Sequence, residues 1–274
     1  MLNRLFAYNP NLKQSWVLIV ILTICGLIFG VATAAINDFV IASKWVDLIG
    51  HVVSFFIAAL IVVRLGKNSN YEPVASLRQS PLLWLLLVPF TLSFGITVEP
   101  LSAWIPMPEW IKQIFAELMQ KSLPTFLMVV VFAPICEEWL LRGIILKGLL
   151  THYSPRKAIV WSAVMFAVMH LNPWQGILAF FLGLMIGWVY WRTRSLWCCI
   201  FIHAVNNAAS YILSVFIFPD VPVDASIADI AGGYYIYAVA LAVCVLTGIW
   251  VKRIISPSPV SAGEWRILRS QNVT

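Results

Sequence analysis

The stretch "FLMVVVFAPICEEWLLRG", residues 126–143, places charged side chains directly after a long apolar run. No charge occurs from Phe126 to Cys136, and Glu137, Glu138 and Arg142 then follow within one and a half helical turns. A run of this kind is typical of a membrane-spanning helix, in which a charged side chain is costly unless it has a partner. The stretch therefore predicts a span whose charges hold helices together or carry out chemistry.

The whole chain shares this apolar character. Of its 274 residues, 61% are hydrophobic and 11% are charged, whereas a soluble domain carries about 25% charged residues. One aqueous core cannot bury so much apolar surface, so we predict an all-α, polytopic integral membrane protein. The thirteen Trp suit membrane interfaces. The net charge of +6 is scattered between apolar runs, so we expect the lipid bilayer as the partner and no nucleic acid.

Eight apolar segments are long enough, or nearly so, to cross the bilayer. They lie at about 16–36, 46–63, 81–98, 123–141, 157–171, 174–191, 196–218 and 233–251. We divide the chain into residues 1–119 with three spans and a surface helix, residues 120–218 with four spans, and residues 219–274 with the last span and a tail.

The basic residues give this layout a direction. If the spans alternate from a cytoplasmic N-terminus, fifteen of the eighteen Lys and Arg fall on the cytoplasmic side. Lys44, Lys112 and Lys121 fall on the outer side. An excess of Lys and Arg on the cytoplasmic side is the positive-inside pattern of membrane proteins. We therefore expect both termini in the cytoplasm. Residues 108–121, "PEWIKQIFAELMQK", have helical amphipathic spacing and predict a helix on the outer surface.

A few polar residues inside the predicted spans lie at similar depth. A helix rise of about 1.5 Å per residue puts Glu137 roughly 15 Å, His170 roughly 20 Å and His203 roughly 12 Å from the cytoplasmic ends of their spans. Asn207 follows His203 by one turn. The hydrocarbon core is about 30 Å thick, so all of them lie near its middle. We therefore predict one shared site.

The residue types suggest how this site could work. Glu138 and Arg142 have the i, i+4 spacing of an intrahelical ion pair, which would support the helix. Glu137 points elsewhere, and a lone carboxylate inside a membrane is a functional hypothesis by default. A carboxylate, two imidazoles and an amide suit peptide hydrolysis by a general base and an oxyanion site. Glu137, His170 and His203 could equally bind Zn²⁺, and the residues leave both possibilities open.

Three short motifs resemble those of a known family. "EEWLLR" at 137–142, "FAVMH" at 166–170 and "HAVNN" at 203–207 are similar to the EExxxR, FxxxH and HxxxN motifs of CPBP-family intramembrane proteases. That family includes type II CAAX prenyl endopeptidases and bacterial Abi proteins. The resemblance covers about residues 120–218 and implies an all-α endopeptidase of the bacterial plasma membrane. Its substrate would be a protein or peptide at the membrane, CAAX-like substrates among them.

The resemblance also implies roles for single residues. Glu137 and His170 would activate the hydrolytic water, and His203 and Asn207 would form the oxyanion site. Family members have been described as metalloproteases and as glutamate enzymes without metal, so zinc stays open. Two other classes stay open too: a non-catalytic membrane protein for immunity or scaffolding, and a proton-coupled transporter, because intramembrane Glu and His also suit proton relays.

Overall fold

The computed structural model of the chain describes residues 8–65 and 79–255, and all regular elements in these ranges are helical. The predicted all-α fold is therefore confirmed for this part of the chain. The elements are α2 (Leu12–Phe39), α3 (Lys44–Leu65), α4 (Pro81–Val98), α5 (Pro100–Ala103), α6 (Glu109–Leu118), α7 (Leu123–Phe126), η1 (Leu127–Phe132), α8 (Ala133–Leu140), η2 (Leu141–Leu146), α9 (Lys147–His152), α10 (Pro155–Met169), α11 (Pro173–Thr193), α12 (Leu196–Ile212), η3 (Leu213–Ile217), α13 (Ile227–Ala231) and α14 (Tyr235–Ile254), where η marks a π-helical segment.

Six helical runs among the described residues are long and apolar enough to cross a membrane. They are α2, α3, α4 with α5, α11, α12 with η3, and α14. Large apolar side chains stay exposed along them, such as Val31 in α2 at 72% and Leu246 in α14 at 60%. Apolar surface of this extent belongs in lipid, because a soluble monomer seldom exposes it. The chain is an integral membrane protein.

The two other predicted spans are helical as well, but their form differs from a regular long α-helix. The first, predicted at 123–141, runs without a break from Leu123 to His152 through α7, η1, α8, η2 and α9. The second is α10, whose 15 residues span about 22 Å, less than the roughly 30 Å of the hydrocarbon core. The count of eight spans therefore stays a prediction.

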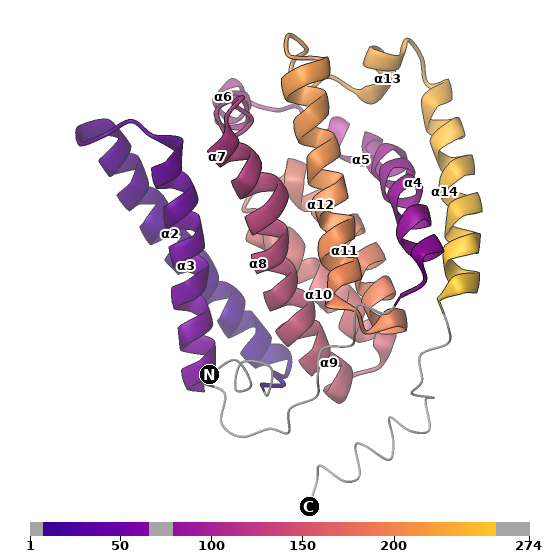
Figure 1. Cartoon of the computed structure of the whole chain (residues 1–274), viewed down its shortest axis with the longest axis horizontal. Coiled ribbons are helices and arrows are strands. Elements are labelled where there is room, and N and C mark those ends of the chain that lie inside the picture. The colour runs from indigo at the N-terminus through magenta and orange to yellow at the C-terminus, as the bar shows by residue number, and fades with distance from the viewer. Residues whose placement is uncertain (1–7, 66–78, 256–274) are drawn as a thin grey trace, which may run out of the picture.

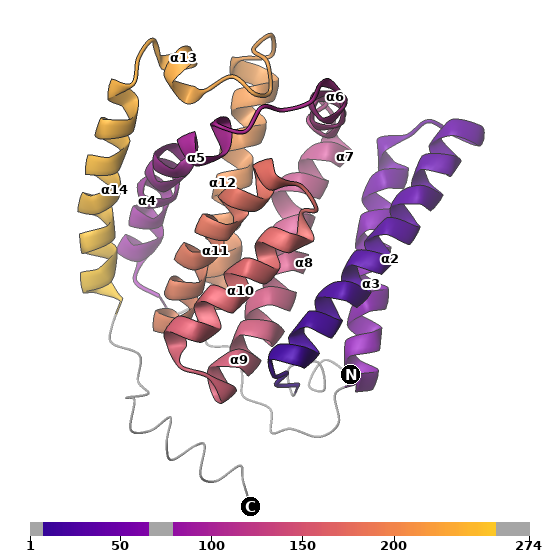
Figure 2. The same cartoon turned by 180° about the vertical axis from the view of Figure 1, so that it is seen from behind.

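Figures 1 and 2 show that the long helices alternate in direction. α2, α4, α10 and α12 start at the end of the molecule where α9 stops, and α5, α6 and α13 lie at the opposite end (Figure 1). We call the first the basic end, because the helix termini that meet there carry Lys13, Arg64, Arg156, Lys157, Arg192, Lys252 and Arg253. We call the other the acidic end, after Asp47, Glu99, Glu109, Glu117, Asp224 and Asp229. The cations Arg4, Lys67, Arg78, Arg266 and Arg269 lie outside the described residues.

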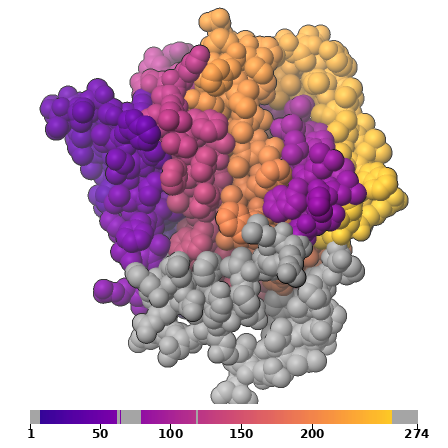
Figure 3. Space-filling view, in the orientation of Figure 1, coloured from indigo at the N-terminus to yellow at the C-terminus, as the bar shows by residue number. Residues whose placement is uncertain are grey.

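The run from α7 to α9 forms the centre of the core. Every residue from Leu140 to Leu150 is buried, and the run contacts α10 and α12. Figure 3 shows the hairpin of α2 and α3 along one flank of this run and α12 along the other. The charges of Glu138 and Arg142 are therefore surrounded by protein and not by lipid.

Polar contacts at the acidic end fix the segments that close the bundle. The predicted surface helix is present as α6, and its Lys112 Nζ lies 2.8 Å from Asp224 Oδ2. The hydrogen bond to Asp224 raises the pKa of Lys112 above its ordinary value. Trp174 Nε1 donates a 2.9 Å hydrogen bond to the Ile105 carbonyl. This bond holds the turn between α10 and α11, in which His170 lies.

Candidate active site

The predicted site residues come from four neighbouring elements. α8 carries the two glutamates, η2 carries Arg142, and α12 carries both His203 and Asn207. His170 is the residue directly after α10. α8 and α12 contact each other, so residues 65 positions apart meet.

A buried ion pair lies at the centre of the site. Arg142 Nη1 donates a 2.8 Å hydrogen bond to Glu138 Oε1, and both side chains have no exposed area. The predicted ion pair is therefore present. Arg142 also donates through Nη2 to the Gly183 carbonyl at 3.2 Å, and its guanidinium lies 5.0 Å from the centre of the Phe166 ring. One arginine thus joins η2 to α10 and α11.

The same carboxylate oxygen binds a histidine. His203 Nδ1 lies 2.9 Å from Glu138 Oε1. A carboxylate that is paired with arginine accepts hydrogen bonds, so Nδ1 carries the hydrogen and Glu138 fixes the tautomer of the ring. The neutral ring of His203 therefore has a lone pair at Nε2. It can donate from Nε2 only when it is protonated.

Glu137 faces the free side of this histidine. Its Oε2 is buried and has no hydrogen-bond partner among the described residues, and it lies 4.0 Å from His203 Nε2. That distance is too long for a direct hydrogen bond. A water about 2.8 Å from both atoms would subtend an angle of about 90° at its oxygen, which a water can adopt. The distance between the two atoms is therefore one that a single bridging water can span.

His170 joins the site through an aromatic ring. Its Nδ1 lies 2.8 Å from the Phe166 carbonyl, and a carbonyl can only accept, so Nδ1 is protonated and a neutral ring accepts at Nε2. The Phe166 ring centre is 5.1 Å from that of His170 and 5.4 Å from that of His203. The motif phenylalanine thus spaces the two imidazoles and also contacts Arg142.

Asn207 lies one turn beyond His203 and is anchored to the π-helical segment η1. Its Nδ2 donates a 2.9 Å hydrogen bond to the Val129 carbonyl, and its Oδ1 accepts from Asn206 Nδ2 at 3.2 Å. The amide nitrogen has a second N–H that these bonds do not use. π-helical turns occur frequently at functional sites. Here one supplies the carbonyl that orients the amide.

The predicted zinc ligands do not form a tetrahedral site in this arrangement. Within residues 8–65 and 79–255, no three His, Cys, Asp or Glu side chains are grouped to hold a metal ion. Two zinc ligands at about 2.1 Å and a tetrahedral angle lie about 3.4 Å apart, whereas Glu137 Oε2 and His203 Nε2 are 4.0 Å apart. We therefore derive no step through a metal.

The sequence analysis missed a third histidine near the site. His51 lies in α3, and its Nε2 is buried without a hydrogen-bond partner among the described residues. The charge of Glu137 acts on it. The signal was present, because His51 is an ionisable residue inside the predicted span 46–63.

These features define the class: a helical membrane bundle with a buried acid–histidine site. Residues 119–209 match the family model described as "Type II CAAX prenyl endopeptidase Rce1-like". The matched segment contains all the predicted site residues, and its similarity to this family of CAAX prenyl endopeptidases agrees with the resemblance that the three motifs carry. No curated protein and no solved structure matches the chain.

Replacing Arg142 by leucine should destabilise the protein by about 3–5 kcal/mol, because Glu138 would remain buried without its counter-charge. Thermal unfolding in detergent micelles measures the loss. The double variant Glu138→Leu/Arg142→Leu should unfold later than Arg142→Leu, because it leaves no buried charge. The control Arg156→Leu removes an exposed cation and should change stability by less than about 0.5 kcal/mol. Equal unfolding temperatures for Arg142→Leu and Arg156→Leu would contradict a structural role for the pair.

Proposed function

We propose that the chain is an intramembrane endopeptidase in which Glu137 activates water to hydrolyse a peptide bond. The observation that carries this proposal is the buried Oε2 of Glu137, which faces His203 Nε2 across 4.0 Å and has no partner among the described residues. Glu138 has both its arginine and its histidine partner through Oε1. Glu138 Oε2 is also buried without a hydrogen-bond partner among the described residues, but the ion pair with Arg142 holds that carboxylate, so we propose that Glu137 is the one that acts on water.

The reaction divides into two proton transfers. Glu137 takes a proton from the water while the water oxygen forms a bond to the carbonyl carbon of the substrate, whose π electrons move onto its oxygen. The tetrahedral intermediate then collapses, the C–N bond breaks, and Glu137 returns the proton to the leaving nitrogen. In the first step, His170 orients the water by accepting from it at Nε2.

Two N–H groups are suited to stabilise the developing oxyanion. The free N–H of Asn207 is one, and Val129 and Asn206 hold that amide in place. His203 supplies the other from Nε2 when its ring is protonated, with Nδ1 bonded to the carboxylate of Glu138. Preorganised donors of this kind lower a barrier by several kcal/mol each.

The substrate class that we propose is a polypeptide at or within the membrane. The carboxylate, the imidazoles and the amide support peptide hydrolysis, and the depth of these groups supports a cut inside the bundle. CAAX-like tails fall within this class, which the description of the matching family names.

Glu137→Gln should abolish the cleavage, because the amide cannot take a proton from water. The test compares the termini of membrane proteins in cells with the wild-type chain and with the variant. Protein amount and thermal unfolding should stay unchanged, since Glu137 Oε2 has no hydrogen-bond partner among the described residues whose loss would weaken the fold. The control Glu109→Gln alters an exposed carboxylate and should keep the wild-type pattern. Identical termini in all three strains would favour the non-catalytic immunity or scaffold protein.

We further propose a mechanism without metal, since the donor atoms at Glu137 and His203 are spaced for a water and not for tetrahedral zinc. Purified protein treated with a chelator and freed of metal should keep its full activity on a substrate identified from the termini. Metal content is measured on the same sample. Activity that disappears on chelation and returns with Zn²⁺ would contradict the glutamate mechanism.

For the topology, we propose eight spans with both termini and the basic end in the cytoplasm. The gathering of cations at one end of the bundle supports this orientation. The alternation of the α7–α9 run and α10 with their neighbours in Figures 1 and 2 supports the count.

Fusions to alkaline phosphatase, which is active only after export, test this topology in a bacterial host. A fusion after Ser154 should be inactive, because eight spans place the turn between α9 and α10 in the cytoplasm. A chain with only the six long spans would export that turn, so an active fusion at Ser154 contradicts the proposal. The control fusion after Asp224 should be active in either case, because an odd number of spans precedes it: seven in the eight-span chain and five in the six-span chain.

A further inference from the structure

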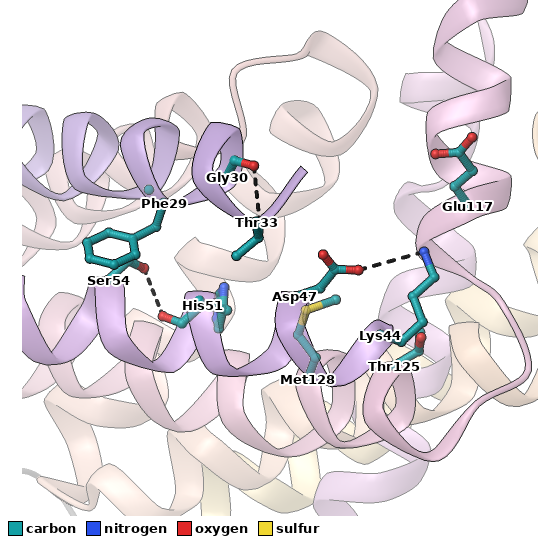
Figure 4. A pocket seen from close by; sticks show the side chains of 12 residues that line it. Phe29, Gly30, Thr33, Lys44, Asp47, His51, Ser54, Glu117, Thr125 and Met128 are labelled. Atoms are coloured by element: carbon teal, nitrogen blue, oxygen red, sulfur yellow. Dashed lines mark hydrogen bonds and ion pairs between the residues drawn. The ribbon is translucent and has the colours of Figure 1, made fainter. Parts of the chain in front are cut away.

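A cavity lies beside the candidate active site, between the α2–α3 hairpin and the α7–η1 segment. Its volume is about 240 Å³, and Figure 4 shows the side chains around it. It is lined by Gly26, Phe29, Gly30, Thr33, Lys44, Asp47, Gly50, His51, Ser54, Glu117, Thr125 and Met128. Lys44, Asp47 and Glu117 belong to the acidic end, so the cavity extends from that end into the bundle.

Several side chains that can hydrogen-bond water reach into this cavity. Hydroxyl, carboxylate, ammonium and imidazole groups line it together with only two large apolar side chains, Phe29 and Met128. A water occupies about 30 Å³ in the liquid, so several would fit. Two glycines, Gly26 and Gly30, help to keep the space open, because a Cβ built on either would meet no atom within 4 Å.

Two observations place the cavity near the candidate active site. His51 lines the cavity, its Nε2 has no hydrogen-bond partner among the described residues, and the charge of Glu137 acts on it. The π-helical segment η1 forms a shared wall: Met128 lines the cavity, and the next residue, Val129, accepts the hydrogen bond of Asn207. The cavity and the candidate active site therefore lie on two sides of the same segment, η1.

We propose that this cavity is a water-filled vestibule that delivers the hydrolytic water from the acidic end to Glu137, with His51 as the positioning residue between them. The inference rests on the proposed function in its last step, because each peptide bond cleaved consumes one water and the surrounding hydrocarbon supplies none. His51 offers the next hydrogen-bonding group along this route, and Glu137 Oε2 is the group that needs the water.

The charges at the mouth predict which solutes enter. Lys44 and Asp47 form an ion pair at 3.7 Å, and Asp47 also accepts from Asn37. Glu117 adds a second carboxylate on α6. Two carboxylates against one ammonium give a net negative mouth, so a small cation should enter faster than an anion of similar size.

Thiol labelling of a His51→Cys variant tests the vestibule without any substrate. In purified protein in detergent, a small cationic methanethiosulfonate reagent should label this variant beyond the background of the wild-type cysteines. It should do so about tenfold faster than an anionic reagent of the same type. Adding Gly30→Leu should slow the labelling several-fold, because the new side chain fills the open space. The matched control Ala32→Leu adds the same side chain to an exposed position of α2 that does not line the cavity, and should leave the rate unchanged.

The outcomes separate this proposal from the proposed function. A Met128→Cys variant serves as a second probe of the same cavity in case His51→Cys does not fold. The vestibule proposal is wrong if neither position is labelled, or if Ala32→Leu slows labelling as much as Gly30→Leu. Either result would overturn it even if Glu137→Gln abolishes cleavage. On an identified substrate, Gly30→Leu and His51→Ala should lower kcat several-fold with KM unchanged. A raised KM with unchanged kcat would mean that the cavity holds substrate and does not supply water.

Discussion

Two opposite charges without any exposed area, those of Arg142 and Glu138, set the strongest constraint on the bundle. A charge in a low-dielectric interior is tolerated only where its partners satisfy it. Arg142 therefore needs both the glutamate and the Gly183 carbonyl, and Glu138 needs both the arginine and His203. These bonds join α8, η2, α11 and α12. A helix displaced from this set would leave a buried charge without a partner, so the register of the core follows from one ion pair.

The same constraint explains why two adjacent glutamates behave differently. Successive helical residues point about 100° apart, so Glu138 faces Arg142 while Glu137 faces the far side of His203. Glu138 accepts the hydrogen of His203 Nδ1, so the neutral ring has a lone pair at Nε2, on the side of Glu137. Phe166 acts in a comparable way from α10, since its ring contacts both histidines and the guanidinium. The supporting residues thus set the positions and the hydrogen-bonding states of the reactive ones.

Much of this arrangement could be predicted from the sequence, because it depends on spacing along helices. The i, i+4 spacing predicted the ion pair of Glu138 and Arg142, and hydropathy predicted the long membrane helices. Depth arithmetic brought Glu137 and His203 together. It also placed His170 nearby, where the structure shows its ring in contact with that of Phe166.

Other features depend on contacts that spacing does not encode. The π-helical turns of η1 and η2 were not predicted from the sequence. His51 reaches the site only because the α2–α3 hairpin packs beside α7 and η1. The tautomer of each histidine depends on the acceptor at its Nδ1. This acceptor is the Phe166 carbonyl for His170 and the Glu138 carboxylate for His203.

An experimental structure at a resolution that reveals ordered water tests the central claim most directly. We expect one water within hydrogen-bond distance of both Glu137 Oε2 and His203 Nε2, with Arg142, Glu138 and His203 bonded in sequence. A structure in which Glu137 and His203 face separate environments, so that no single water can touch both, would contradict the account.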